Sequence, residues 1–354
     1  MRVAIVAEPY YPIPPVNYGG TERVIHYLIK GLLEKGHQPV LLGPGDSRVA
    51  CPVVPTTAKA IYFPKNSRQL AEFEKLKIAT QKRTQTELKK ILPKIEVIHS
   101  HGFDLRAFSD FPSVTTLHGA MSFENLKYYK ERDGLFYVSI SKNQQAAYPG
   151  LKYAQTVYNG LDPDDFPLIT KPQNYVLFLG RLDHEKNPHL AIHLAINSGI
   201  EIKLAGKVDF QGSDYFKNEV QPYLNHPLVE YLGEVDEKTR ISLLANAKCN
   251  LHPTSFREPF GLTVMEAAYC GTPTLAIARG SMPELIEQGK TGALVEDFVE
   301  GFHKLENCFG LDRQYIAERS RQLFNYRRMT DGYLRAYRRV ISEFERSAGV
   351  KFRR

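Results

Sequence analysis

The stretch Glu258-Pro-Phe-Gly-Leu-Thr-Val-Met-Glu266 combines two acids with a turn sequence, and it is the part of the chain best suited to chemistry. We expect a helix from Leu262 to Tyr269 directly after the turn, which places Glu266 about one turn inside that helix. Glu266 can then accept hydrogen bonds from ribose hydroxyls. Glu258, in the preceding loop, can reach the hydroxyls of a sugar.

The start of this predicted helix is a candidate anion site. The first backbone N–H groups of a helix have no partner within it, and the helix dipole attracts negative charge. A diphosphate is therefore expected beside Gly261 and the N–H groups of Leu262, Thr263 and Val264. A second interpretation stays open, in which Thr263 and Glu266 form a capping box that only completes the helix start.

Two glycines near the N-terminus form a second candidate site. Gly19 and Gly20 precede a predicted helix start at Thr21. A backbone without side chains can approach a phosphate closely at such a place. A flexible turn before an N-cap threonine is the alternative.

Three polar residues follow predicted strands in the first half of the chain. His118 ends a strand-like run and precedes a glycine, so it is expected at the carboxyl edge of a sheet, where ligands bind in α/β proteins. A histidine satisfied within the core is the alternative. Ser139 and Ser141, also at a strand end, are candidate contacts for an acceptor or a phosphate, and Ser141 fits a helix N-cap equally well.

Alternating strands and helices must position these residues. Strand runs are predicted first at 3–7, 39–42, 97–99, 114–117, 136–140 and 156–158. After a polar linker that ends at Pro172, further strands are predicted at 175–179, 202–205, 229–232, 250–252, 274–277 and 292–295. This alternation predicts an α/β protein with two doubly wound parallel sheets.

The predicted domains comprise residues 1–165 and 166–330. Apolar residues at helical spacing from Tyr326 onward mark a long final helix. Its segment 331–354 is expected to join the first domain, and the helix could pack across both.

Composition limits the class of protein. The 354 residues exceed what one hydrophobic core holds, and 43% are apolar and 24% charged, as in globular proteins. No apolar run approaches the roughly 20 residues of a spanning helix, and the start shows no signal-peptide pattern, so a cytoplasmic location is expected. Four cysteines without CxxC spacing indicate neither a zinc site nor a disulfide framework.

The net charge of +7 favours an acidic partner, for which nucleic acid, anionic lipid and a phosphorylated substrate are the candidates. Segment 73–94 concentrates this charge, with seven Lys or Arg residues around Leu76, Ile78, Leu88, Ile91 and Leu92. Such a segment is typical of a solvated helix face, and also of a basic amphipathic helix on the inner face of an anionic membrane. Both interpretations stay open.

Several motifs occur in one order through most of the chain. They are Gly19-Gly20-Thr21-Glu22, His118-Gly119, Ser139-Ile-Ser141, Asn159-Gly-Leu-Asp162, Gly180-Arg-Leu182, Glu185-Lys-Asn187, Ala205-Gly206, and the two glutamates Glu258 and Glu266 separated by seven residues. In these motifs the chain resembles the GT4 family of retaining glycosyltransferases. That family has the GT-B fold, in which two Rossmann-like domains face an interdomain cleft.

The resemblance implies transfer of a hexosyl group from a nucleotide-diphosphate sugar to a hydroxyl acceptor with retention. Arg181 and Lys186 would neutralise the donor diphosphate as it leaves. His118, on the acceptor side, would bond the transferred sugar. Asp162-Pro-Asp164-Asp165 has the spacing of a metal motif, but it follows Asn159-Gly160, where the resemblance implies an aspartate that binds no metal. No metal or other cofactor is expected, because Arg181, Lys186 and the helix N–H groups would neutralise the charge.

The donor and acceptor are less well defined. A UDP-sugar is the first expectation and a GDP-sugar the second, while the acceptor is a saccharide, a glycolipid or a small molecule. No nucleic-acid partner is expected. The alternatives are a sugar-nucleotide epimerase or hydrolase of the same fold, and a protein that binds sugar nucleotides or polyanions without turnover. A dehydrogenase is disfavoured because Gly19-Gly20 is no GxGxxG fingerprint.

Overall fold

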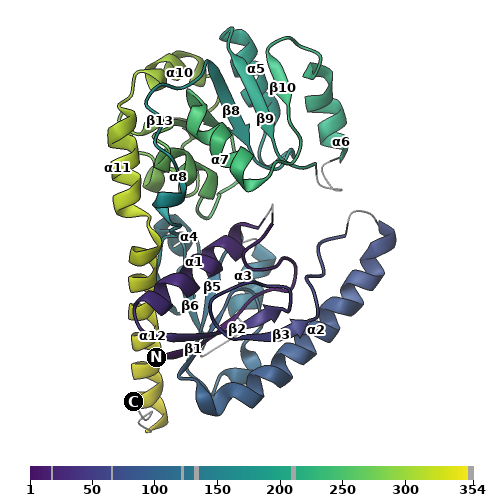
Figure 1. Cartoon of the computed structure of the whole chain (residues 1–354), viewed down its shortest axis with the longest axis vertical. Helices are drawn as coiled ribbons and strands as arrows, with labels where there is room; N and C mark the ends of the chain where they lie inside the picture. Colours follow the sequence, from purple (N-terminus) through teal and green to yellow (C-terminus); the bar gives the residue numbers. More distant parts are fainter. Residues whose placement is uncertain (17–18, 65–66, 121–122, 131–134, 209–212, 350–354) are drawn as a thin grey trace. The chain divides into compact units, whose positions relative to one another are not determined.

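The computed structural model describes residues 1–16, 19–64, 67–120, 123–130, 135–208 and 213–349 (Figure 1). The chain divides into two compact units. The first comprises Met1–Leu161 with Tyr326–Arg354, and the second comprises Asp162–Asn325. The boundaries thus fall after residues 161 and 325, where the sequence pattern places them after 165 and 330.

The first unit contains a seven-stranded parallel sheet in the order β3-β2-β1-β4-β5-β6-β7. Its strands are β1 (Arg2–Val6), β2 (Gln38–Pro44), β3 (Val53–Thr57), β4 (Val97–Ser100), β5 (Ser113–Leu117), β6 (Phe136–Ser139) and β7 (Tyr153–Thr156). Its α-helices are α1 (Gly20–Glu34), α2 (Leu70–Ile91), α3 (Phe123–Lys130), α4 (Lys142–Ala147) and α12 (Tyr326–Ala348).

Helix α12 brings the C-terminal part of the chain back to the first unit, beside α1 (Figure 1), and it also contacts β5 and β7. Its apolar face is buried, as the helical spacing predicts, with Tyr333 and Tyr337 fully enclosed. Gly31 of α1 permits the close approach of the two helices, because a Cβ there would overlap the side chain of Thr330.

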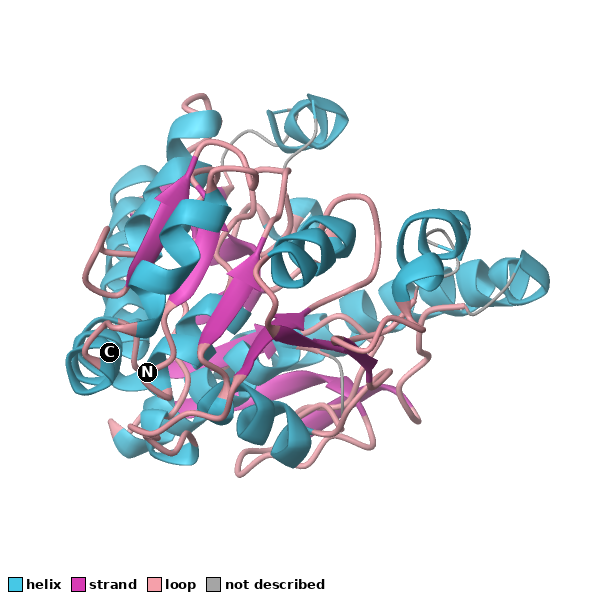
Figure 2. Ribbon diagram, turned by 90° about the horizontal axis from the view of Figure 1, so that it is seen from above, coloured by secondary structure: helices cyan, strands magenta, loops and turns pink. Residues whose placement is uncertain are grey.

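The second unit contains a six-stranded parallel sheet in the order β10-β9-β8-β11-β12-β13. Its strands are β8 (Tyr175–Leu179), β9 (Glu201–Ala205), β10 (Val229–Tyr231), β11 (Cys249–His252), β12 (Thr274–Ile277) and β13 (Gly292–Val295). Its α-helices are α5 (Pro188–Asn197), α6 (Ser213–Tyr215), α7 (Glu237–Asn246), α8 (Leu262–Tyr269), α9 (Met282–Leu285), α10 (Gly301–Phe309) and α11 (Arg313–Leu323). Helices pack against the strands of the sheets, which are magenta in Figure 2.

Each sheet has one point at which the strand order reverses. In the first sheet this point lies between β1 and β4, and in the second it lies between β8 and β11. Loops that leave the two strands on opposite faces open a crevice at their carboxyl ends, where ligands of α/β proteins bind. The two parallel-sheet domains expected from the sequence are confirmed, and the topology selects the loops after these four strands as candidate ligand contacts.

Three local expectations are wrong. No strand was expected at β3, an edge strand that contains Pro55 and pairs only with β2. A strand was expected at 156–158, but the strand in this region, β7, already ends at Thr156. Helix α1 begins at Gly20, and its N-cap is Gly19 rather than Thr21.

Two further predictions concern the cysteines and membrane-spanning helices. Cys249, Cys270 and Cys308 are buried, Cys51 is partly buried, and all four are free thiols. In the part of the chain that the structure describes, no helix combines the length and the apolar character needed to cross a bilayer.

Candidate active site

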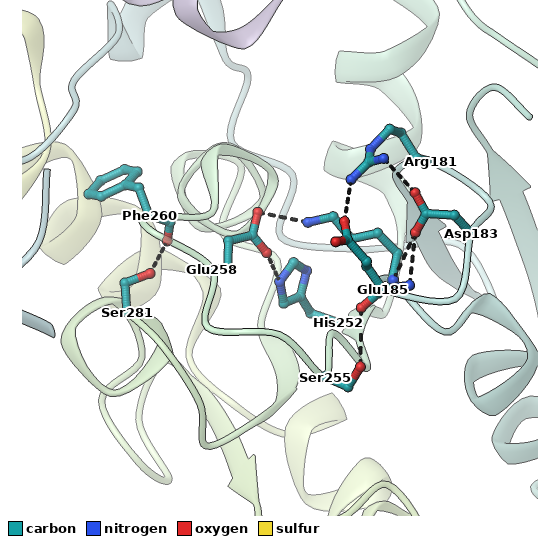
Figure 3. Close-up of polar contacts among 9 residues, drawn as sticks. Arg181, Asp183, Glu185, His252, Ser255, Glu258, Phe260 and Ser281 are labelled. Carbon is teal, nitrogen blue, oxygen red and sulfur yellow. Dashed lines mark hydrogen bonds and ion pairs between the residues drawn. The ribbon is translucent and has the colours of Figure 1, made fainter. Parts of the chain in front are cut away.

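The loop after β8 folds around the buried carboxylate of Asp183. Asp183 Oδ1 accepts hydrogen bonds from the backbone N–H groups of Glu185 (3.1 Å) and Lys186 (3.0 Å), which fixes the turn into α5. Asp183 Oδ2 lies 2.6 Å from Arg181 Nη1, and Glu185 Oε2 lies 2.8 Å from Arg181 Nη2. Two carboxylates therefore orient the Arg181 guanidinium, which remains 29% exposed (Figure 3).

The loop after β11 carries Glu258, which lies between two basic side chains. Glu258 Oε1 is 2.8 Å from Lys186 Nζ, and Glu258 Oε2 is 2.7 Å from His252 Nε2 (Figure 3). His252 is the last residue of β11 and is buried. The ion pair thus joins the two loops that meet where the strand order reverses.

These contacts determine the charge of Glu258. Burial raises the pKa of its carboxyl, but attraction to Lys186 and His252 and the hydrogen bonds from both outweigh burial and hold the pKa well below the usual range. Glu258 is therefore an ionised hydrogen-bond acceptor, which fits a carboxylate that holds sugar hydroxyls.

Backbone contacts hold the two loops in register. The N–H group of Ser255 donates to the Glu185 carbonyl (3.1 Å), and Asn187 Nδ2 donates to the Pro253 carbonyl (3.1 Å). A third loop supports Glu258, whose carbonyl accepts from the Ser281 N–H group (3.0 Å). These contacts fix the positions of the loops that carry Lys186 and Glu258.

Helix α8 begins at Leu262 and ends at Tyr269, as the sequence predicts. Its N-cap is Gly261, with a φ of 96° and no side-chain cap, so the capping-box interpretation of Thr263 is wrong because Thr263 already lies within the helix. The Val264 N–H group donates to the Gly261 carbonyl (3.1 Å). Among the described residues, this leaves the N–H groups of Leu262 and Thr263 for an anion.

The second glutamate of the motif lies deeper than expected. The Glu266 side chain has no exposed surface, and its Oε2 atom makes a short ion pair with Arg240 Nη1 from α7. Arg240 Nη2 also contacts Glu237 Oε1 at 3.1 Å. A ribose contact by Glu266 stays a prediction.

In the first unit, the expected ligand contact His118 lies beside a second histidine, His101. His118, one residue past β5, is half-buried, and its Nε2 atom lies 2.8 Å from Nδ1 of His101, one residue past β4. Burial lowers the pKa of His118 to about 4. The imidazole is therefore neutral near pH 7.

Gly19 has a structural reason to be glycine. Its φ is 150°, and a Cβ there would lie 2.6 Å from Pro15 Cβ and 2.9 Å from Glu22 Oε2. Glu22 is buried, and its pKa is raised to about 7, chiefly by burial and further by the charge of Glu8. A phosphate contact at Gly19 and Gly20 stays a prediction.

Ser139 and Ser141 lie inside the first unit, and a contact of either residue with an acceptor or a phosphate stays a prediction. Both side chains are fully buried. Ser139 Oγ lies 2.7 Å from Thr156 Oγ1 within the sheet, and Ser141 Oγ accepts from the Gln144 N–H group as the N-cap of α4. The N-cap interpretation of Ser141 is confirmed.

The aspartates at the domain boundary have a local role. Asp162 Oδ1 accepts from the Asp164 N–H group (3.2 Å) and caps a short 3-10 turn at Pro163–Asp165. Within the described ranges, no group of three or more His, Cys, Asp or Glu side chains is arranged to hold a metal ion.

Four positioning residues were missed from the sequence. His252 ends one predicted strand and His101 lies two residues past another, each at the carboxyl edge of its own sheet, so their place could have identified them. Asp183 lies between the motifs Gly180-Arg-Leu182 and Glu185-Lys-Asn187, and no pattern in the sequence showed that it would pair with Arg181. Arg240 gave no signal, because only the tertiary fold brings α7 to Glu266.

Comparisons with known proteins agree with this geometry. The family model described as Glycosyltransferase Family 4 matches residues 18–164, and that of Glycosyl transferases group 1 matches residues 164–321. The two Rossmann-like domains, together with these family matches, define a glycosyltransferase of the GT-B fold. The chain belongs to the GT4-type glycosyltransferases.

Individual relatives are distant. Glycogen synthase of Mycobacterium tuberculosis is 26% identical over 353 residues, with 82% of this chain and 81% of that protein covered. AviGT4, a glycosyltransferase involved in avilamycin A biosynthesis, shares 22% identity with a TM-score of 0.74 and covers 97% of this chain and 98% of its own. Anabaena HepE, solved with UDP and glucose, shares 19% identity with a TM-score of 0.69. The match covers 94% of this chain and 98% of HepE.

Proposed function

We propose that this glycosyltransferase moves a hexosyl group from a nucleotide-diphosphate sugar to a hydroxyl acceptor with retention of configuration. The observation that carries the proposal is the ionised Glu258 held between Lys186 and His252, where the order of the second sheet reverses. The start of α8 lies four residues further along the chain. A carboxylate that can hold sugar hydroxyls thus lies close in the chain to a candidate anion site.

Each residue then has a defined role. Arg181, Lys186 and the first N–H groups of α8 supply positive charge to the diphosphate, and Glu258 holds hydroxyls of the sugar. The bond between the anomeric carbon and the phosphate oxygen breaks as the acceptor oxygen bonds the same face of the sugar. The proton of the acceptor hydroxyl passes to the departing phosphate oxygen.

A UDP-sugar is the first candidate donor and a GDP-sugar the second. The complex of HepE with UDP and glucose supports this order. We propose further that no divalent ion takes part, because the cations and helix N–H groups of this chain already supply the charge that the leaving group needs.

A donor screen tests the proposal. The protein is incubated with each UDP- and GDP-sugar and a panel of saccharide, glycolipid and small-molecule acceptors, with and without EDTA. We expect nucleotide diphosphate release that depends on the acceptor and is unchanged by EDTA. Free sugar or an epimerised donor in place of a glycosylated acceptor would support the alternative enzymes, and no turnover with any donor would overturn the proposal.

Peripheral contact with an anionic membrane is a second part of the proposal, and α2 carries it. Of the apolar residues in this segment, Leu88 is buried in the core, whereas Leu76 and Ile78 are 43% and 51% exposed. Lys82 and Arg83 on the same helix are exposed. Exposed apolar groups beside cations fit the surface of an anionic bilayer.

Vesicle flotation tests this contact. We expect the protein to float with phosphatidylcholine vesicles that contain about 30% phosphatidylglycerol, and not with phosphatidylcholine alone. The double variant Leu76→Glu with Ile78→Glu should stay with the soluble fraction. The matched control carries Val299→Glu and Phe302→Glu, two exposed apolar residues of the second unit. Equal flotation of both variants would contradict a role for α2.

A further inference from the structure

Three imidazoles, called here the histidine stack, lie in a row at the carboxyl edge of the first sheet, with the rings of His99 and His101 tilted by 38°. The ring centroids of His99 and His101 are 4.0 Å apart, and those of His101 and His118 are 5.0 Å apart with the planes within 23°. His99 and His101 are buried, and only His118 reaches the surface. The stack therefore links the core of the first unit to the histidine expected to contact the ligand.

The inner end of the stack is anchored by hydrogen bonds. His99 Nδ1 lies 2.7 Å from the Tyr337 hydroxyl, and His99 Nε2 lies 2.7 Å from Thr116 Oγ1. Helix α12 therefore fixes the ring of His99. The ring of His101 packs against the ring of His99. His101 in turn can adopt few orientations.

The bond between His101 Nδ1 and His118 Nε2 allows two arrangements of protons. Burial holds the pKa values of His99, His101 and His118 below the usual range, so each ring carries one proton. Either His101 donates Nδ1–H to His118, or His118 donates Nε2–H to His101. In the first case His118 presents Nδ1–H to a ligand, and in the second it presents a bare nitrogen.

The far side of His101 distinguishes the two arrangements. His101 Nε2 is buried, and no hydrogen-bond partner for it lies within the described ranges. If His118 were the donor, this atom would carry an unpaired buried N–H group. Orphaned buried donors are rarer in proteins than acceptors without a partner. The arrangement in which His101 donates is therefore favoured.

We propose that His101 is a positioning residue that donates Nδ1–H to His118 Nε2 and thereby holds His118 in the Nδ1–H form. His118 then acts as a neutral hydrogen-bond donor toward an oxygen of the bound sugar or acceptor, and not as a base. This role toward the ligand rests on the proposed transfer reaction. The tautomer itself does not.

Nitrogen NMR of the full chain tests the tautomer without any substrate. The protein is labelled with ¹⁵N-histidine, and the His118 signals are assigned with the variant His118→Gln. Long-range ¹H–¹⁵N correlations should show His118 protonated at Nδ1 and bare at Nε2. A His118 protonated at Nε2 would overturn the proposal, whether or not the chain transfers a sugar.

Two variants at His101 test its effect on the reaction. An asparagine amide can still donate from the position of Nδ1, so His101→Asn should retain kcat/KM within about threefold and keep the tautomer. An ionised aspartate can only accept, so His101→Asp should force His118 into the Nε2–H form and lower kcat/KM by about tenfold. An unchanged tautomer in a folded His101→Asp protein would contradict the positioning role.

Discussion

In the proposed reaction, Glu258 and a donor diphosphate would share one cation, Lys186. Lys186 Nζ lies 2.8 Å from Glu258 Oε1 in the structure, so the carboxylate reduces the attraction that the lysine exerts on a phosphate. His252 holds the other oxygen of Glu258 and keeps the carboxylate in place. Glu258 is therefore expected to contribute to the handling of the sugar more than to the binding of the nucleotide.

The variant Glu258→Gln separates these contributions. We expect kcat to fall by about a hundredfold, because an ionised acceptor of sugar hydroxyls is lost. The Kd for UDP or GDP should stay within about threefold or decrease, because Lys186 loses a competing anion. Steady-state kinetics and calorimetric titration measure the two effects.

Glu266→Gln is the variant with which Glu258→Gln is compared. It removes the charge that pairs with buried Arg240, so both the nucleotide affinity and the stability should decrease. Equal losses of nucleotide affinity in the two variants would contradict the division of roles.

Glu22 gives the first unit a dependence on pH. Its pKa is about 7 in the folded chain and 4.5 in an unfolded one, so the folded state binds more protons between these values. The contribution to stability is complete below pH 4.5 and is lost as the pH rises through about 7, by about 3 kcal/mol in total.

Replacement of Glu22 by glutamine should remove this loss. Urea unfolding of Glu22→Gln and the unaltered protein should agree at about pH 4.5 and diverge toward about pH 8, with the variant more stable. The matched control is Glu306→Gln on the exposed face of α10, which should show no such divergence. A Glu22→Gln protein that gains nothing at the higher pH would refute the raised pKa.

The sequence could predict some residues of the site and not others. Arg181, Lys186 and Glu258 stand in motifs that follow strands, and the topology places all three at the same edge of one sheet. The ion pair of Glu266 could not be predicted. Arg240 reaches Glu266 from another helix, and nothing in the sequence near either residue records that contact.

At the scale of elements, the loop after β9 approaches the loop after β8 closely, and this approach depends on Gly206. Its N–H group donates to the Gly233 carbonyl (2.8 Å), and the Gly180 N–H group donates to the Ala205 carbonyl (3.0 Å). A Cβ at Gly206 would overlap the carbonyl oxygen of Gly180, and its φ is 150°. The glycine therefore sets the backbone that leads to Arg181.

The variant Gly206→Ala should lower the free energy of unfolding by about 3 kcal/mol or more, because backbone atoms must move. Gly199→Ala is the matched control. It also has a positive φ, 64°, but a Cβ there meets nothing within 4 Å, so it should cost only about 1 kcal/mol. Urea denaturation measures both, and equal losses would show that strain in φ, and not the overlap, decides the outcome.

Elements were predicted best where their sequence pattern is strong. The strands at Tyr175–Leu179, Thr274–Ile277 and Gly292–Val295 and the helix at Leu262–Tyr269 have the predicted bounds. β3 was missed because an edge strand can contain proline and needs little buried apolar surface. Pairing with β2, which the sequence does not show locally, determines that this segment is a strand.

At the scale of the whole molecule, the two units are built from different parts of the chain. The first requires α12, which follows the entire second unit in the sequence and supplies Tyr333 and Tyr337 to the core beside His99. The amphipathic pattern predicted a long final helix that packs through its apolar face. The hydrogen bonds that join Tyr337 to the histidine stack depend on the tertiary fold and could not be predicted.

The anomeric configuration of the product tests the central claim most directly. An α-linked UDP-sugar or GDP-sugar that the protein accepts is supplied, and the coupling constant of the anomeric proton is read by ¹H NMR before the product can equilibrate. Retention predicts an α-linked product, which forms equally in EDTA and forms about a hundredfold more slowly in Glu258→Gln. A β-linked product would contradict the proposed mechanism at this site.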